Sequence, residues 1–143
     1  MMLPEFYVDD LIRLALKEDI NYIDVATDLL LCPATTATAH MLAKADGVLC
    51  GVDVALRVFT LLSSEFTFEV FKKDGDVLHK GDIIAKVTGP VTLLLKGERT
   101  ALNLIQHMSG IATATARLVA LTEGTKATIA DTRKTLPGMR ALQ

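Results

Sequence analysis

Two adjacent cations, Arg133 and Lys134, follow a short β-prone run and stand just before a helix signal. The run is residues 128–130 (TIA), and Pro137 occupies a position typical of a first helical turn. In α/β barrels the loop after a strand lies at the catalytic face, and the next helix offers unpaired N–H donors at its N-terminus. Arg can hold a carboxylate or phosphate through two parallel hydrogen bonds, whereas Lys adds a compact point charge. The pattern predicts one βα unit with an anion site, although these residues alone also fit a solvated loop and do not name a ligand.

A second polar feature lies on the helix predicted from Glu98 to about Glu123. At 100° per residue one side of it is apolar and comprises Ala101, Leu104, Ile105, Met108, Ile111 and Ala112. The opposite side, called the polar strip below, comprises Arg99, Asn103, Gln106, His107, Gly110 and Arg117. A surface helix rarely uses Asn or Gly, and Gly110 costs about 1 kcal/mol relative to Ala. We therefore expect another backbone, a ligand or a second subunit to approach the polar strip.

The cysteine and histidine residues show no pattern of a reactive centre. Cys32 and Cys50 lack CxxC spacing, so we expect both to be reduced, small and buried. His107 has no carboxylate or second histidine at the spacing of metal ligands, and we expect it to be a structural, hydrogen-bonding residue. The sequence therefore predicts neither a metal site nor a nucleophile at these positions.

Hydrophobic periodicity predicts the elements that must position these residues. Apolar residues at helical spacing predict helices over residues 4–18, 51–64 and 98–123. Alternating and β-prone runs predict strands within residues 37–50, 66–71, 91–95 and 128–130. Turn signals stand at residues 74–75, 80–81 and 89–90. These features describe an α+β unit that leads into a long helix.

Length and composition exclude several classes of protein. The 143 residues suit one domain, or one small domain plus part of another. Half of the residues are hydrophobic and 22% are charged, which is typical of a folded chain. The net charge of -2 gives no basic field for nucleic acid, and no apolar run approaches the ~20 residues that span a bilayer. With its acidic N-terminal region, the chain is predicted to be cytoplasmic and to bind neither nucleic acid nor membrane.

The segment over residues 72–97 resembles the hammerhead or barrel-sandwich hairpins of biotinyl and lipoyl carrier domains. Those carriers place a modified lysine at a tight turn within a motif such as MKM, and this sequence contains none. Lys72, Lys73 and Lys80 are therefore expected to be solvated hairpin charges rather than attachment sites.

Three blocks of the sequence together resemble the quinolinate phosphoribosyltransferase family, the carboxylating nicotinate-nucleotide pyrophosphorylases. The blocks are TAHMLAKADGVLCG at residues 38–51, KGERTALNLIQHMSGIAT at residues 96–113 and DTRKTLPGMRALQ at residues 131–143. The resemblance covers nearly the whole chain. Its motifs are very specific as a set, whereas any single block would be weaker.

The resemblance implies an α+β fold in two parts. Residues 1–97 would form the family's N-terminal α/β sandwich domain, which is like a barrel-sandwich hybrid. Residues 98–143 would hold the linking helix and the first βα elements of a type II phosphoribosyltransferase α/β barrel, which is incomplete in this family. The rest of that barrel would lie beyond this sequence.

The resemblance also implies an enzyme of NAD biosynthesis. Such a pentosyltransferase converts quinolinate and phosphoribosyl pyrophosphate, with Mg²⁺, to nicotinate mononucleotide, pyrophosphate and CO₂. Thr132, Arg133 and Lys134 would belong to the quinolinate pocket, and Arg99 would reach it from the neighbouring subunit of a homodimer or larger homo-oligomer. The catalytic residues and Mg²⁺ ligands would lie outside this sequence, so the present chain alone is expected to be inactive.

Two other interpretations remain open from the sequence. A related type II phosphoribosyltransferase, either the molybdenum-transport-associated homologue or a nicotinate-using enzyme, would be separated by testing quinolinate against nicotinate. A non-catalytic domain that binds a partner chain is a different class. Mass spectrometry of the intact material would reveal such a second polypeptide.

Overall fold

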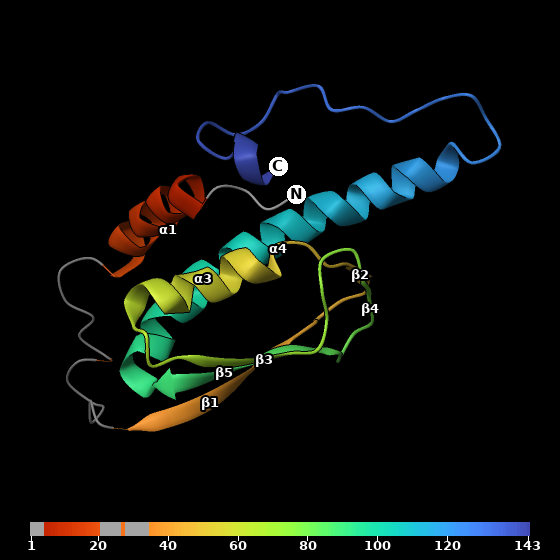
Figure 1. The fold of residues 1–143 in the computed structure, drawn as a ribbon. Helices are drawn as coiled ribbons and strands as arrows, with labels where there is room; N and C mark the ends of the chain where they lie inside the picture. Colours follow the sequence, from red (N-terminus) through yellow and green to blue (C-terminus); the bar gives the residue numbers. More distant parts are fainter. Residues whose placement is uncertain (1–4, 21–26, 28–34) are drawn as a thin grey trace.

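The architecture is a small antiparallel sheet with helices over one face (Figure 1). The computed structural model describes residues 5–20, 27 and 35–143. Its helices in these ranges are α1 (Glu5–Ile20), α3 (Val52–Leu62) and α4 (Val91–Leu121), with a 3₁₀ turn η1 (Arg140–Leu142). Its strands are β1 (Thr36–Leu42), β2 (Gly47–Val48), β3 (Thr67–Val70), β4 (Val77–Leu78) and β5 (Ile83–Pro90). This mixture confirms the α+β class.

The main sheet has the strand order β1-β5-β3, and both neighbours run antiparallel to β5. The central strand β5 buries alternate side chains such as Ala85 and Val87. β1 is an edge strand of this sheet, and β2 pairs with β4 in a separate ribbon. The turns predicted at residues 74–75 and 80–81 are confirmed. The turn predicted at residues 89–90 is wrong, because these residues end β5 and lead directly into α4.

Helix α3 begins at a glycine and is capped from a distant turn. Gly51 has a φ of 96°, in the left-handed region that residues with a Cβ rarely adopt. The Asp74 carboxylate accepts hydrogen bonds from the backbone N–H groups of Gly51 and Val52 at 2.9 and 3.0 Å. It thereby satisfies donors that the helix itself leaves unpaired. The turn at residues 74–75 therefore fixes the start of α3.

Helix α4 carries the polar strip on one side and packs its other side into the core. Four predicted core residues are buried, namely Ala101, Leu104, Ile105 and Met108. The strand predicted over residues 91–95 is wrong, because α4 already begins at Val91. Periodicity alone cannot assign so short an apolar run to a helix or a strand. Close packing on α3 decides for the helix: a Cβ added to Gly97 would lie 2.9 Å from the Phe59 ring.

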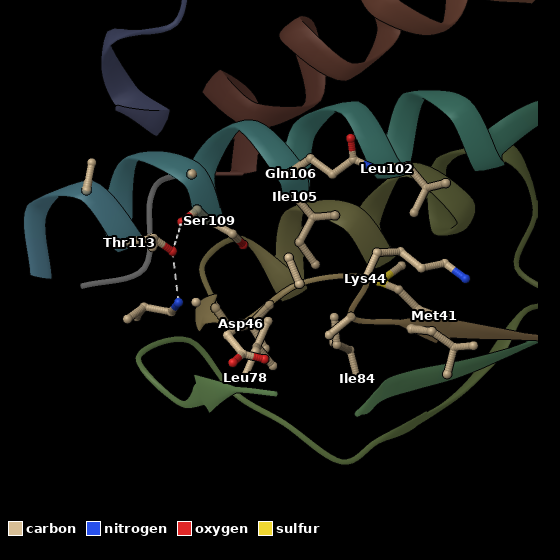
Figure 2. Close-up of a pocket in the computed structure, with 18 of the residues that line it drawn as sticks. Met41, Lys44, Asp46, Leu78, Ile84, Leu102, Ile105, Gln106, Ser109 and Thr113 are labelled. Carbon is tan, nitrogen blue, oxygen red and sulfur yellow. Dashed lines mark hydrogen bonds between the residues drawn. The ribbon is translucent and has the colours of Figure 1, made fainter. Parts of the chain in front are cut away.

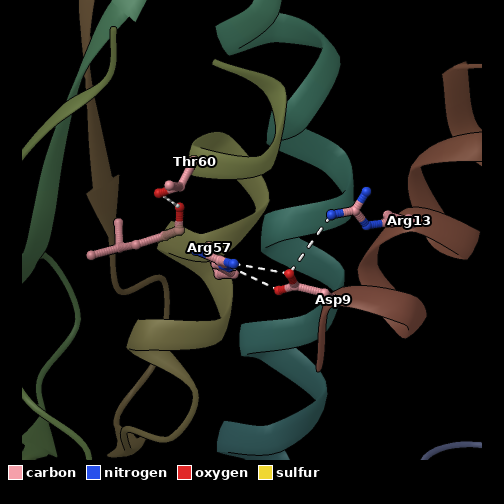
Figure 3. Close-up of polar contacts among 5 residues, drawn as sticks. Asp9, Arg13, Arg57 and Thr60 are labelled. Carbon is pink, nitrogen blue, oxygen red and sulfur yellow. Dashed lines mark hydrogen bonds and ion pairs between the residues drawn. The ribbon is translucent and has the colours of Figure 1, made fainter. Parts of the chain in front are cut away.

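An ion pair fastens α1 to α3 (Figure 3). Arg57 donates from Nε and Nη2 to the two carboxylate oxygens of Asp9 at 2.8 and 2.9 Å. Arg13, one turn along α1, lies 3.8 Å from the same carboxylate. The hydrogen bond from Arg57 lowers the pKa of Asp9 from its ordinary value, and partial desolvation opposes this shift.

Replacing Asp9 by Asn is expected to lower the free energy of unfolding at neutral pH and to lower it less in acid. The folded pKa of Asp9 lies below its unfolded value of about 3.9, so the charge contributes fully above that value and loses its contribution as the pH falls through the folded pKa. Urea unfolding of wild type and Asp9→Asn at about pH 7 and pH 3 measures the difference. Asp10→Asn, an exposed neighbour, is the control. A difference in the free energy of unfolding that does not shrink in acid would contradict the ion-pair explanation.

Beyond α4 the chain is extended and then returns toward α1 (Figure 1). The strand predicted at residues 128–130 is wrong, because these residues are exposed and pair with no strand in the described part of the chain. A β-prone run needs a neighbouring strand for its hydrogen bonds, and its own sequence cannot supply one. The helix predicted at Pro137 is also wrong: a turn and η1 stand there, and Leu142 of η1 is buried in the core.

The predicted division between residues 97 and 98 falls inside α4, which continues through it. The boundary of the two parts therefore stays a prediction. Among residues 5–20, 27 and 35–143, no helix is both long and apolar enough to cross a membrane.

Candidate functional site

The loop at residues 131–134 has a constrained backbone. Arg133 has a φ of 60° and is the one non-glycine residue in the left-handed region among those described. The Asp131 carboxylate accepts a hydrogen bond from the Arg133 N–H, which stabilises this turn. Arg140 donates from Nη2 to the Arg133 carbonyl oxygen at 3.4 Å and from Nε to the Thr135 hydroxyl at 3.3 Å. Conformations of this kind cluster at functional sites, where the surrounding structure maintains them.

The predicted substrate residues of this loop, Thr132, Arg133 and Lys134, are all exposed. Together with Arg140 they place three positive charges in one short segment, and Asp131 offsets one of them. A guanidinium beside an ammonium can hold a ligand with two anionic groups. The loop therefore has the chemistry of an anion site that is open to solvent.

Arg99 lies near the start of α4 and contacts the end of α1. Its Nη1 donates to the Asp19 carboxylate at 2.6 Å. The Arg99 side chain is 72% exposed, whereas the Asp19 side chain is 22% exposed. The loop at residues 132–134 instead takes its hydrogen bonds from Asp131 and Arg140. The structure therefore describes Arg99 beside the end of α1 and residues 132–134 on the segment that follows α4.

A groove runs between α4 and the end of β1 (Figure 2). It consists of a cavity of about 520 Å³ and an adjoining one of about 400 Å³, and we call it the α4 groove. The two cavities share Met41, Leu42, Lys44, Leu102 and Gln106. Gly110 and Arg117 of the polar strip line the larger cavity. A Cβ added to Gly110 would meet nothing within 4 Å, so open space lies before it. Gln106, Gly110 and Arg117 of the strip therefore border a concave surface of mixed apolar and polar character, which is typical of binding sites.

Two hydroxyl groups fix the rotation of α4 beside this groove (Figure 2). Ser109 Oγ accepts from the Cys50 N–H at 3.0 Å and donates to the Cys50 carbonyl at 3.1 Å. Thr113 Oγ1 accepts from the Val48 N–H at 2.9 Å and donates to the Ser109 carbonyl at 2.7 Å. These bonds join α4 to β2 and to the residues after it, so they fix which side of α4 borders the groove.

The surroundings of Cys50 and His107 bear on whether either side chain is reactive. The Cys50 thiol is free, and burial raises its pKa with a further contribution from Asp74, so it is a poor nucleophile near neutral pH. Cys32 lies outside the described residues. His107 Nε2 makes a hydrogen-bond contact with the Gln143 side-chain amide, which confirms that this histidine is hydrogen-bonded; its structural role stays a prediction. The part of the chain that the structure describes holds no group of three His, Cys, Asp or Glu residues that could bind a metal ion.

Family profiles cover most of the chain. The profile of the quinolinate phosphoribosyl transferase N-terminal domain matches residues 24–109, and that of the C-terminal domain matches residues 111–143. The chain belongs to the quinolinate phosphoribosyltransferase family. This membership confirms the resemblance carried by the three sequence blocks. The two profiles meet inside α4.

Relatives of this family span about twice the present length. The carboxylating nicotinate-nucleotide pyrophosphorylase of Mycobacterium leprae (strain TN) is 45% identical over 137 residues, which are 94% of this chain and 48% of the relative. The chloroplastic enzyme of the same name from Arabidopsis thaliana is 38% identical and matches 96% of this chain and 39% of its own. The crystal structure of NadC from Streptococcus pyogenes superposes with a TM-score of 0.93 at 41% identity and covers 98% of this chain and 51% of that one. The chain therefore has the fold of quinolinate phosphoribosyltransferases over about half their length.

Sequence reasoning missed Asp19, the partner of Arg99 in this family member. One signal could have revealed it: Asp19 stands in the last turn of α1, where the helix dipole disfavours an acid. An acidic residue at such a position needs a cation from elsewhere. The sequence does not show which cation pairs with Asp19, because Arg99 is 80 residues away.

Proposed function

We propose that this chain forms the N-terminal part of a cytoplasmic enzyme that converts quinolinate and phosphoribosyl pyrophosphate to nicotinate mononucleotide, pyrophosphate and CO₂. The observation that carries the proposal is the exposed Arg133-Lys134 pair, on a turn held by Asp131 and Arg140 in a chain of this family. Quinolinate carries two carboxylates on adjacent ring carbons. A bidentate guanidinium beside an ammonium matches such a dianion, and the Thr132 hydroxyl can add a further donor.

In the proposed reaction the loop positions the ring while bonds change at its nitrogen. The ring nitrogen attacks the anomeric carbon of phosphoribosyl pyrophosphate, and pyrophosphate leaves through a state of oxocarbenium character. Holding both carboxylates directs the nitrogen lone pair at that carbon, which lowers the entropic part of the barrier. The pyridinium product then accepts the electron pair released with CO₂, and a proton takes the vacated position. The residues of this chain contribute position and charge rather than proton transfer.

Mg²⁺ is proposed to accompany phosphoribosyl pyrophosphate in the complete enzyme, where it would neutralise the pyrophosphate charge. The described residues do not provide a fitting set of ligands, since they hold no cluster of three His, Cys, Asp or Glu side chains. The ligands of Mg²⁺ are therefore expected in the part of the complete enzyme that this sequence does not cover.

A homodimer or larger homo-oligomer is proposed to assemble over the α4 groove. Arg99, Gln106 and Gly110 lie on one strip of α4, and the space before Gly110 is open. A neighbouring subunit that filled the groove would contact Gln106 and Gly110. We propose that the exposed Arg99, farther along the same strip, reaches into that subunit. Arg99 of one copy would then complete the carboxylate pocket that residues 132–134 of the other copy begin.

The full-length protein is expected to form nicotinate mononucleotide from quinolinate rather than from nicotinate, and the present chain alone should form none. Chromatographic detection of the product in the presence of phosphoribosyl pyrophosphate and Mg²⁺ measures both. Product made by the present chain alone would contradict the proposal that essential residues of the active site lie outside this sequence. A preference for nicotinate would favour a related type II phosphoribosyltransferase. No turnover, with a second polypeptide bound to this chain, would favour a partner-binding domain.

A further inference from the structure

Two carboxylates of α1 each bind an arginine of a neighbouring helix, but the two pairs differ in exposure. Asp9 and Arg57 are 15% and 30% exposed, and parallel hydrogen bonds join them. Asp19 is 22% exposed, while its partner Arg99 is 72% exposed and donates through Nη1 at 2.6 Å. The first pair is enclosed between helices. The second has a sheltered carboxylate and a cation that extends into solvent.

Asp19 is expected to contribute little to the free energy of unfolding. Asp19 lies in the last turn of α1, at the negative end of the helix dipole, which disfavours it. Its pair with a largely exposed arginine also contributes little, because water screens the charges and both side chains lose rotamer freedom. The effect of Asp19 on the orientation of Arg99 explains better why an acidic residue occupies position 19.

We propose that Asp19 is a positioning residue, which sets the direction in which Arg99 presents its guanidinium to the dianionic substrate. The inference rests on the proposed function for the identity of that substrate, a pyridine dicarboxylate. A guanidinium carries five N–H donors in one plane, so the bond to Asp19 orients the plane and is compatible with a ligand carboxylate on the same group. Removing Asp19 takes away one bond that orders this long side chain before substrate binds, so more of the ordering cost falls on binding and weakens it.

Steady-state kinetics of the full-length enzyme test this role. Asp19→Asn is expected to raise the KM for quinolinate about tenfold, a loss comparable to that seen when a carboxylate that orients a metal-binding histidine is removed. The KM for phosphoribosyl pyrophosphate and the Tm should stay near their wild-type values. Asp10→Asn removes the same charge from an exposed position of α1 and should leave both KM values unchanged.

A double variant separates positioning from other effects. In an Arg99→Ala background, Asp19→Asn should raise the KM for quinolinate no further, because Asp19 acts through Arg99. A further rise in that background would overturn the proposal. A fall in Tm with an unchanged KM would also overturn it, since the pair would then be a structural contact only.

A second measurement does not depend on turnover. Nitrogen-15 NMR of the present chain reports how fast the Arg99 guanidinium rotates, and Asp19→Asn should speed this rotation while Asp10→Asn should not. Equal rotation in wild type and Asp19→Asn would overturn the inference. If the full-length protein does not use quinolinate but the rotation differs as expected, the substrate assignment fails and the positioning contact stands.

Discussion

A mixture of two inactive full-length variants, Arg99→Ala and Arg133→Ala, is expected to recover about a quarter of the wild-type activity, because random pairing in a two-fold dimer restores one site in half of the dimers. Each variant alone should lose roughly 30- to 5,000-fold in kcat/KM for quinolinate, since leaving a substrate carboxylate unpaired in the filled pocket costs about 2–5 kcal/mol. Recovery requires that Arg99 of one copy serve the loop of the other. The measurement is nicotinate mononucleotide formation after the two variants are mixed, partly dissociated and reassembled.

The matched control is a mixture of Arg133→Ala with Lys134→Ala. Both residues lie on the same loop, so every site in this mixture carries a defective loop and no activity should return. If the Arg99→Ala and Arg133→Ala mixture stays inactive although mixed dimers form, Arg99 does not act across subunits. Near-normal activity of either single variant would remove that residue from the proposed pocket.

Gly89→Ala is expected to destabilise the present chain by about 3 kcal/mol, the upper part of the usual range for overpacking a core. A Cβ at this position would lie 2.3 Å from Cδ1 of Phe66. The Phe66 ring cannot easily move away, because it is 7% exposed and packs on Phe59 with ring centroids 5.3 Å apart. Thermal unfolding should show a fall in Tm of roughly 10 °C. In a Phe66→Ala background Gly89→Ala should cost much less, because the atoms nearest the added Cβ are Cδ1, Cε1 and Cγ of Phe66 and alanine lacks all three.

Gly110→Ala is a control that is expected to increase the free energy of unfolding, whereas Gly89→Ala decreases it. It lies on an exposed side of α4 with open space before it, so Ala should raise the free energy of unfolding by about 0.5–1 kcal/mol through helix propensity alone. A similar loss of stability in Gly89→Ala and Gly110→Ala would show that steric contact with Phe66 is not the cause. In the full-length oligomer Gly110→Ala should instead weaken assembly, if a second subunit approaches this strip as proposed.

Local patterns predicted those elements whose periodicity is long and regular. Helices α1 and α3 and the buried side of α4 follow apolar residues at helical spacing, because each helix must bury one side to be stable. The alternating run within residues 37–50 produced β1 for the same reason. The predictions of secondary structure were wrong where the apolar pattern was short. Residues 91–95 joined α4 because of close packing on α3, and residues 128–130 found no strand neighbour among the described residues.

The sequence by itself determined the chemistry of the candidate site and the family. Arg133 and Lys134 were identifiable from residue type and spacing, and the motif blocks around them are matched by the family profiles. Charge and hydrogen-bonding capacity belong to each side chain, so they can be read along the chain without knowledge of the fold.

Only the tertiary structure decided how these groups are held. It placed Arg99 beside Asp19, joined by a contact between residues 80 positions apart, and it put Arg133 in a left-handed turn that Asp131 and Arg140 support. It also placed Gln106, Gly110 and Arg117 of the polar strip along a groove formed with β1 and β2. Contacts of this kind depend on helix packing and strand register across the whole domain, and these in turn depend on long-range burial rather than on the local sequence.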